Sequence, residues 1–357
     1  MNPTLRPMAR LCAGAASLTL LGLLSGCTSQ DKDVVAWVGN EPIRKEEFYP
    51  RVMAVSEIPQ GFTSDAGALT LVNMIRDRLT DQLAAMHHAQ PTKDLVDQAV
   101  AYDVRMSPET EELMVRGRLT QKDLFRQKRY EMETFGIGTD GDNPSDADID
   151  KVYEEYKNRP EFTFPASYTA RVLEAPDDAT ARKIIADVKQ TGDFKAAAMK
   201  FLNAPAMTAE IAAKERRLRA TQLAPEQYQP LRDALEKLKP NEITSEPVAF
   251  KVPDPNQPLT STFKYYVVQL KSKDPEQKLT KDEMMFLLRP LALQKTHPGW
   301  KEHYVRQLAD YYKMVQSNIH IELPQYEGLP EAYIRPLVNA GVAQASGAAP
   351  AQAPANP

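Results

Sequence analysis

Histidine, cysteine and clustered carboxylates are the residues of this chain best able to do acid–base, nucleophilic or metal chemistry. The five histidines are at positions 87, 88, 297, 303 and 320. His87 and His88 are adjacent, so on a helix they point to different sides and make a poor chelate. A metal role for His303 would need a second ligand four residues later, where Gln307 stands. We therefore expect His303 to be a solvated or rim histidine, and we expect no metal and no cofactor.

A run of aspartates in Gly136-Ile-Gly-Thr-Asp-Gly-Asp-Asn-Pro-Ser145 invites comparison with a calcium loop. Pro144 falls where a third ligand should be and Ser145 where the loop needs glycine, which excludes an EF-hand. Ser145 and Asp148 are instead typical of a capping box for a helix over residues 146–157. The sequence has no phosphate loop and no Gly-x-Ser-x-Gly elbow, so hydrolase and kinase functions have no support.

The N-terminus has the pattern of a targeting segment. Arg6 and Arg10 precede an apolar run of fourteen residues, 11–24. This run is shorter than the about 20 apolar residues of a membrane-spanning helix. Leu24-Ser25-Gly26-Cys27 resembles the lipobox of bacterial lipoproteins, which implies a signal over residues 1–26 and a lipid on Cys27. The alternative is an ordinary secretory signal followed by a chance cysteine.

A lipidated mature chain would have no free thiol, because Cys12 leaves with the signal and Cys27 carries the lipid. We expect a lipid-anchored protein of the periplasm, and the lipoprotein sorting rule, read at Thr28, favours the outer membrane. Loss of Arg6 and Arg10 changes the formal charge from -4 to about -6, so no nucleic-acid partner is expected.

The stretch from Ala166 to Lys271 has the strongest pattern of alternating strands and helices. Tyr168, Ala170 and Val172 alternate with polar neighbours, which predicts a strand over residues 167–173. Helix formers from residue 179 to 189 end at Gly192. Further helices are predicted from residue 193 and over 225–238, and further strands over 247–250 and 265–270.

This order of elements resembles the parvulin family of peptidyl-prolyl isomerases, also called PpiC-like. The phrases that carry the resemblance are residues 178–185 with Gly192-Asp-Phe194, and the run from Tyr228 to Val248 with its Lys-Pro-Asn-Glu-Ile turn. The family places one histidine at the end of the first strand and another in the last strand. In this chain Arg171 and Tyr266 stand at those positions, and residues 202–217 have no Gly-Gly loop. The resemblance therefore implies an isomerase fold with a degenerate active site.

An isomerase must lower a rotation barrier of about 18–20 kcal/mol by holding the prolyl bond twisted in a shaped pocket. Without the histidines we expect weak or absent catalysis, with the groove kept for binding or as a scaffold. The candidate wall residues are Met199, Phe201, Tyr228 and Tyr266, although each also fits the core of the domain.

The flanks of this stretch resemble the SurA and PrsA type of foldase, which places a helical chaperone domain around a parvulin domain. Residues 34–48 predict a strand, a tight turn and a helix start, similar to the opening of those proteins. Trp300, Tyr304, Leu308, Tyr311 and Val315 form one helical stripe that needs a partner. Residues 319–323 predict a strand that pairs with residues 34–38.

The predicted fold class is α+β, with a parvulin-like domain of antiparallel sheet and helices inserted into a SurA-N-like helical domain. The expected divisions are a signal at 1–26, a lipidated tether at 27–33, the helical domain at 34–160, the parvulin-like domain at 161–273, C-terminal helices and a strand at 274–323 that complete the helical domain, and a tail at 324–357, disordered from about 342.

Three functions remain open. The first is a lipid-anchored periplasmic chaperone or foldase that binds unfolded or extended exported polypeptides. The second is an active isomerase in which Tyr168, Arg171 and Tyr266 supply hydrogen-bond donors near the prolyl carbonyl. The third is a dedicated structural subunit of an envelope assembly for secretion or polysaccharide export.

Overall fold

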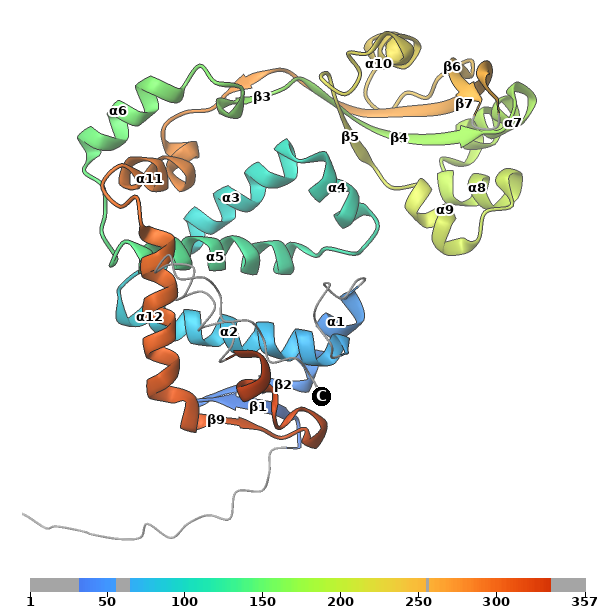
Figure 1. The fold of residues 1–357 in the computed structure, drawn as a ribbon. Coiled ribbons are helices and arrows are strands. Elements are labelled where there is room, and N and C mark those ends of the chain that lie inside the picture. The colour runs from blue at the N-terminus through green and yellow to red at the C-terminus, as the bar shows by residue number, and fades with distance from the viewer. Residues whose placement is uncertain (1–31, 56–64, 255–256, 335–357) are drawn as a thin grey trace, which may run out of the picture.

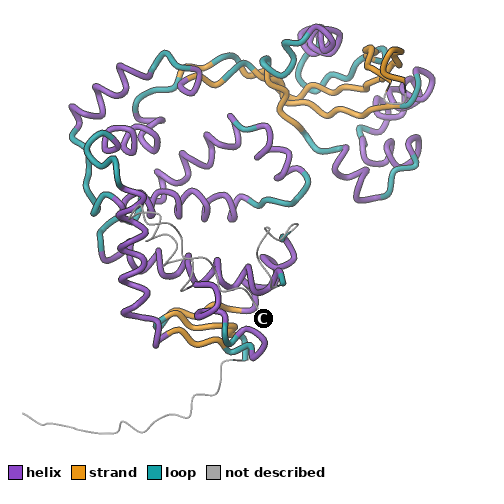
Figure 2. Tube along the Cα trace, viewed as in Figure 1, coloured by secondary structure: helices purple, strands orange, loops and turns teal. Residues whose placement is uncertain are grey.

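The computed structural model describes residues 32–55, 65–254 and 257–334. The described chain forms a helical lobe and a sheet module (Figure 1), and Figure 2 shows the longest strands gathered in that module. The predicted α+β class, with a sheet domain inserted into a helical one, is confirmed. The predicted signal, Cys27 and the tail beyond residue 334 lie outside the described residues.

The helical lobe is built from both ends of the described chain. Its helices are α1 (Lys45–Ala54), α2 (Ala66–Met86), α3 (Lys93–Met106), α4 (Pro108–Val115), α5 (Gln121–Gly138) and α12 (Trp300–Val315). A small antiparallel sheet in the order β2-β1-β9 joins β1 (Val34–Val38), β2 (Glu41–Arg44) and β9 (Ile319–Ile321). Ala36 stands opposite Ile321 in this sheet, so the predicted pairing of the two terminal strands is confirmed.

Helix α2 runs through the core of the lobe. Asp65 caps it by accepting a hydrogen bond from the Ala68 amide at 2.8 Å, and aspartate is one of the residue types preferred at this position. The predicted stripe of α12 packs against the lobe, since Leu308 belongs to the same buried cluster as α2. The Tyr304 hydroxyl lies 3.0 Å from Thr80 Oγ1 of α2. The apolar stripe of α12 is therefore covered by the helical lobe, as predicted from its apolar area.

Residues 324–334 also pack onto this lobe, although the sequence places them in the tail. Leu329 and Ile334 are buried in the lobe core. The Tyr326 hydroxyl donates to Asp65 Oδ1 at 3.0 Å. The segment contains a 3-10 turn (Pro324–Tyr326) and a π-helical turn (Pro330–Ile334), and its anchors, at spacings of three and five residues, form no repeating helical or strand pattern. The burial of these residues could therefore not be predicted from sequence periodicity.

Two chain passes connect the lobe to the module, and they lie side by side (Figure 1). The outgoing pass contains α6 (Asp146–Tyr156) and β3 (Thr163–Phe164), and the returning pass contains β8 (Gln277–Lys278) and α11 (Met285–Gln294). Strands β3 and β8 pair antiparallel. Phe162 and Met284, one from each pass, are buried in a shared cluster.

The module is a four-stranded antiparallel sheet in the order β5-β4-β7-β6, with helices on both faces. Its strands are β4 (Ser167–Ala175), β5 (Arg216–Arg219), β6 (Val248–Asp254) and β7 (Gln257–Asp274), and its helices are α7 (Asp178–Thr191), α8 (Phe194–Leu202), α9 (Ala206–Ala212) and α10 (Gln229–Lys237). Gly192 ends α7 with a left-handed φ of 72°, as predicted for its stop signal.

Strand alternation divides the apolar residues of the module into two cores. Leu173 and Val267 pack with α7 and α8 on one face of the sheet. Ala170 and Val268 pack with α10 on the other face. Because successive strand residues point to opposite faces, side chains over residues 170–175 of β4 and 265–270 of β7, where the pairing has no register shift, can be assigned to a face from their position in this alternation.

Three local features differ from the prediction. Helix α9 and strand β5 occupy the segment expected to be loop, and β7 extends well beyond residues 265–270. The first three residues of the run 136–145, which the sequence analysis compared with a calcium loop, continue α5 to Gly138. Gly138 is helical because its missing side chain leaves room for α12, where a Cβ would stand 2.3 Å from the Trp300 carbonyl oxygen.

A buried carboxyl group joins α5 to α2. The Glu133 side chain has no exposed area and accepts a hydrogen bond from Arg129 Nε at 2.7 Å. Arg129 also contacts Asp81 of α2 at 3.0 Å. Burial, with a hydrogen bond to Asp81 and repulsion from its charge, raises the pKa of Glu133 to about 8.

Replacing Glu133 with glutamine should make the lobe less sensitive to alkaline pH. The native state binds this proton more tightly than the unfolded chain, so the stabilisation is complete below the ordinary value of 4.5 and is lost as the pH rises through about 8. Between about pH 5 and about pH 9, the free energy of unfolding of Glu133→Gln should rise relative to that of wild type by on the order of 1–3 kcal/mol, since one pKa unit corresponds to about 1.4 kcal/mol. Urea unfolding across this pH range measures the gain.

Glu131→Gln is the matched control, because Glu131 lies on the same helix and its side chain is 49% exposed. It should show no such pH trend. Parallel stability curves for wild type and Glu133→Gln would contradict the assigned pKa.

Candidate functional site

The two positions that the resemblance assigns to lost histidines lie on the central strands of the module. Arg171 of β4 stands opposite Gln269 of β7, and Tyr266 of β7 stands opposite Glu174 of β4. Arg171 is in phase with the residues that pack on α7 and α8, whereas Tyr266 packs on the α10 side. The two side chains therefore lie on opposite faces of the sheet.

Tyr266 is held by an aromatic partner and a carboxylate. Its hydroxyl donates to Glu174 Oε2 at 2.8 Å, and its ring stacks on Phe250 with centroids 4.5 Å apart and planes 6° apart. Burial and the Glu174 carboxylate raise the pKa of Tyr266 above its ordinary value. The phenol therefore stays protonated at neutral pH, and its proton is already donated to Glu174.

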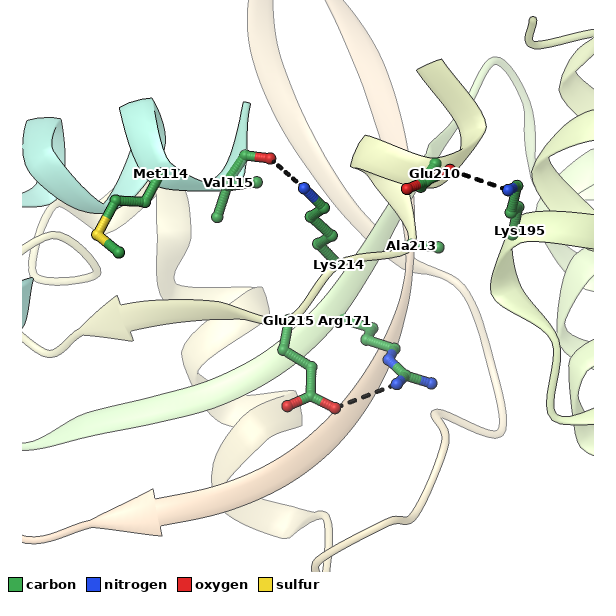
Figure 3. Close-up of a pocket in the computed structure, with 8 residues that line it drawn as sticks. All are labelled: Met114, Val115, Arg171, Lys195, Glu210, Ala213, Lys214 and Glu215. Carbon is green, nitrogen blue, oxygen red and sulfur yellow. Dashed lines mark hydrogen bonds and ion pairs between the residues drawn. The ribbon is translucent and has the colours of Figure 1, made fainter. Parts of the chain in front are cut away.

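Arg171 lies at a hollow of about 540 Å³ between the module and α4 (Figure 3). Its Nη2 atom pairs with Glu215 Oε1 at 3.1 Å. Two lysines line the same hollow: Lys195 pairs with Glu210 at 3.0 Å, and Lys214 donates to the Val115 carbonyl at 2.7 Å. Each basic group shown in Figure 3 is thus already engaged by an oxygen of the protein.

The four candidate wall residues are divided between the two faces of the module. Tyr228 and Tyr266 belong to the α10 side, where both rings contact Phe250. Phe201 packs with the α7–α8 core, and Met199, also on α8, is 45% exposed. The structure thus brings Tyr228 and Tyr266 together, but it does not join them to Met199 and Phe201.

The three donors of the active-isomerase alternative do not meet at one point. Tyr168 packs on the α10 side with Tyr266, whereas Arg171 lies on the other face of the sheet. A single prolyl carbonyl cannot be reached from both faces. Between residues 161 and 273 the sequence also has no histidine and no cysteine. Histidine, the side chain that most often titrates near pH 7, is therefore not part of this segment.

An arginine of β5 fastens the module to the helical lobe. The Arg219 side chain is 3% exposed and pairs with Glu111 of α4 at 3.1 Å. It also donates to the carbonyls of Arg105 and Val104, at 2.9 and 3.2 Å. The Arg217 amide donates to Glu111 Oε1 at 2.6 Å. Edge strand β5 is therefore covered by α4, which also protects an edge that would otherwise be open to pairing.

A second hollow, here called the lobe cleft, lies between α1, α2 and the start of α5. Its outer part has a volume of about 630 Å³, and a deeper part of about 170 Å³ shares lining residues with it. The shared residues are Glu47, Arg51, Asp77, Lys122 and Arg126. Pro50, Leu119 and Phe125 add apolar wall. Sequence periodicity did not reveal this cleft, because its residues come from three separate segments.

Two histidines unexpectedly share one carboxylate where α2, α5 and α12 meet. His87 Nδ1 and His303 Nε2 lie 3.6 and 3.4 Å from Asp140 Oδ1. His303 is also 2.8 Å from Gln307, the residue that stands where a second metal ligand would be needed. Within the described residues, no set of three potential ligands is arranged to hold a metal ion. Nor does any described helix combine the length and apolarity needed to cross a membrane.

Comparison with known families identifies the module. Residues 144–284 match the family described as the PPIC-type PPIase domain. The resemblance to parvulins, predicted from the phrases around residues 178–194 and 228–248, is confirmed for this segment. None of the curated proteins matches the sequence.

Several solved structures are similar to most of the chain at low identity. The foldase protein PrsA from Lactococcus lactis is 17% identical, with 84% of this chain and 98% of that chain covered and a TM-score of 0.29. PrsA from Bacillus cereus is 13% identical, with 84% and 98% covered and a TM-score of 0.25. A SurA-like chaperone from Campylobacter jejuni is 16% identical, with 80% and 94% covered and a TM-score of 0.29.

Replacing Arg219 with alanine should loosen the module from the lobe. The change leaves the Glu111 carboxylate and two main-chain carbonyls without this donor. Because breaking a buried ion pair costs about 3–5 kcal/mol, we expect a stability loss of about 3 kcal/mol. We also expect a larger radius of gyration in small-angle X-ray scattering.

Arg216→Ala is the control, since its pair with Glu112 is at 3.3 Å and the two side chains are 35% and 36% exposed. It should cost less than about 1 kcal/mol and leave the scattering unchanged. If Arg219→Ala scattered like wild type, the module would be held by other contacts.

Proposed function

We propose that this protein is a foldase-type chaperone that binds unfolded or extended exported polypeptides, with an isomerase-type module whose catalysis is weak or lost. The observation that carries the proposal is the placement of Arg171 and Tyr266. Each is engaged by a carboxylate, and they lie on opposite faces of the sheet. The module thus keeps the fold of the PPIC-type domain without a convergent set of catalytic groups.

The helical lobe supplies the second line of support for a binding function. The lobe cleft lies among α1, α2 and α5, outside the residues that match the isomerase family. Its size and its mixture of apolar and charged walls suit an extended chain with alternating side chains. Binding there needs no catalytic group, so it is compatible with the loss of chemistry in the module.

The proposed location is the periplasm, with the chain anchored to a membrane, the outer one in preference, by lipid on Cys27. The support is the sequence pattern alone: Arg6 and Arg10, the apolar run over residues 11–24, and the small residues before Cys27. A lipid anchor would hold the lobe near the membrane surface, where newly exported chains arrive.

The function is tested by two assays on the mature chain. We expect it to suppress the aggregation of a chemically unfolded client at stoichiometric concentration. In a prolyl-tetrapeptide assay we expect isomerisation within about twofold of the spontaneous rate, because no group stabilises the twisted bond. Arg171→His with Tyr266→His should also fail to raise the rate, because alternation keeps the two imidazoles on opposite faces.

Turnover well above background that is lost on changing Arg171 or Tyr266 would overturn the proposed loss of catalysis. Failure to suppress aggregation, with an intact fold by circular dichroism, would overturn the chaperone function. A single stoichiometric partner on affinity capture from membranes would instead favour a dedicated subunit of an envelope assembly.

The lipid anchor is tested by metabolic labelling with an alkyne fatty acid in a bacterial host. We expect Cys27→Ala to abolish the label, because the thiol is the acceptor. Cys12→Ala is the matched control and should keep the label, since Cys12 lies within the proposed signal. Labelling of Cys27→Ala equal to wild type would exclude the proposed anchor.

A further inference from the structure

The deep part of the lobe cleft has more basic than acidic side chains, in a chain whose formal net charge is -4. Its charged lining consists of Arg51, Arg78, Lys122, Arg126 and Arg129 against Glu47, Asp77 and Asp81. The outer part adds Arg118, Glu46 and Asp123. The outer part therefore has equal numbers of basic and acidic lining residues, and the excess of basic residues is found in the lining of the deep part, which shares Lys122 and Arg126 with the outer part.

The acidic groups of the deep part are already neutralised by some of these cations. Asp77 pairs with Arg51 at 3.3 Å, Glu47 with Arg78 at 2.9 Å, and Asp81 with Arg129 at 3.0 Å. Lys122 is different, because no described carboxylate lies within ion-pair distance of its ammonium group. It is the basic group of the deep cleft that remains available to a ligand.

Arg126 shares its acidic partner with a helix cap. Its acidic partner is Asp123 at 2.8 Å, and the same carboxylate accepts hydrogen bonds from Thr120 to cap α5. Arg126 and Lys122 both project from the first turns of α5, whose N-terminal dipole adds positive potential. Across the cleft, burial and then repulsion from Arg126 lower the pKa of Arg51. A bound anion would relieve this repulsion.

We propose that the lobe cleft prefers acidic segments of extended polypeptide, whose Asp or Glu carboxylates contact Lys122 and Arg126. The inference rests on the proposed function and names the class of segment that the cleft selects. A polypeptide is favoured over a small anion because Leu119, Phe125 and Pro50 line the same cleft and would remain unused by an ion. Neighbouring apolar side chains of a client would cover them.

The test compares fluorescent peptides of identical length that differ only in Asp, Asn or Lys at alternate positions between leucines. By fluorescence anisotropy on the mature chain, we expect the Asp peptide to bind about tenfold more tightly than the Asn peptide, and the Lys peptide to bind most weakly. Lys122→Gln should reduce the Asp preference about fivefold, which corresponds to about 1 kcal/mol for one charge pair near a surface.

Lys128→Gln is the matched control, because it removes the same charge from the same helix at a position that faces Asp103 of α3 at 3.3 Å. It should leave the Asp preference unchanged. Equal binding of the Asp and Asn peptides would overturn the inference and leave the chaperone function standing. Binding of neither peptide, together with failure to suppress aggregation, would overturn both.

Inorganic phosphate provides the remaining arm of the experiment. At matched ionic strength it should displace the Asp peptide no better than chloride does, because the cleft also depends on apolar contacts. If phosphate displaced the peptide at concentrations below the peptide Kd, Lys122 and Arg126 would be a binding site for a phosphate-bearing ligand. This result would overturn the polypeptide inference.

Discussion

The helical lobe depends on the pairing of its two ends. Strand β9, near the end of the described chain, pairs with β1, near its start, and α12 packs against α2 and α5 beside them. The chain between α5 and α12 must leave the lobe and return to it. The paired strands β3 and β8 mark where the chain does so, and they keep the two passes together. The sheet module can therefore be a separate folded body without interrupting the lobe core.

Within the module, the alternation of strand side chains decides what chemistry is available. Moving one residue along a strand changes the face of the sheet on which the side chain lies. Arg171 and Tyr266 are separated in this way, and each is paired locally with a carboxylate. Each of the two side chains thus has a local partner on its own face of the sheet.

The elements with strong local signals were predictable from the sequence. The stripe of α12, the cap at Asp65, the stop at Gly192 and the pairing of residues 319–323 with β1 all follow from spacing and residue type. Strand β5 was missed because its run of arginines is polar and short, and it forms only against β4 and α4. The pKa of Glu133 and the shape of the lobe cleft depend on contacts between distant segments, which no local pattern specifies.

The closure of the lobe by β9 also has a consequence for biogenesis. A polypeptide is synthesised from its amino end, so β1, α2 and α5 emerge long before the strand and helix that cover them. The sheet module has all of its strands within one continuous stretch and is able to mature first. Until α12 has emerged, α2 lacks the part of its cover that Leu308 and Ala309 provide, although α1 and α5 already pack on it. The core of the lobe is therefore complete only when the carboxyl-terminal segment has packed.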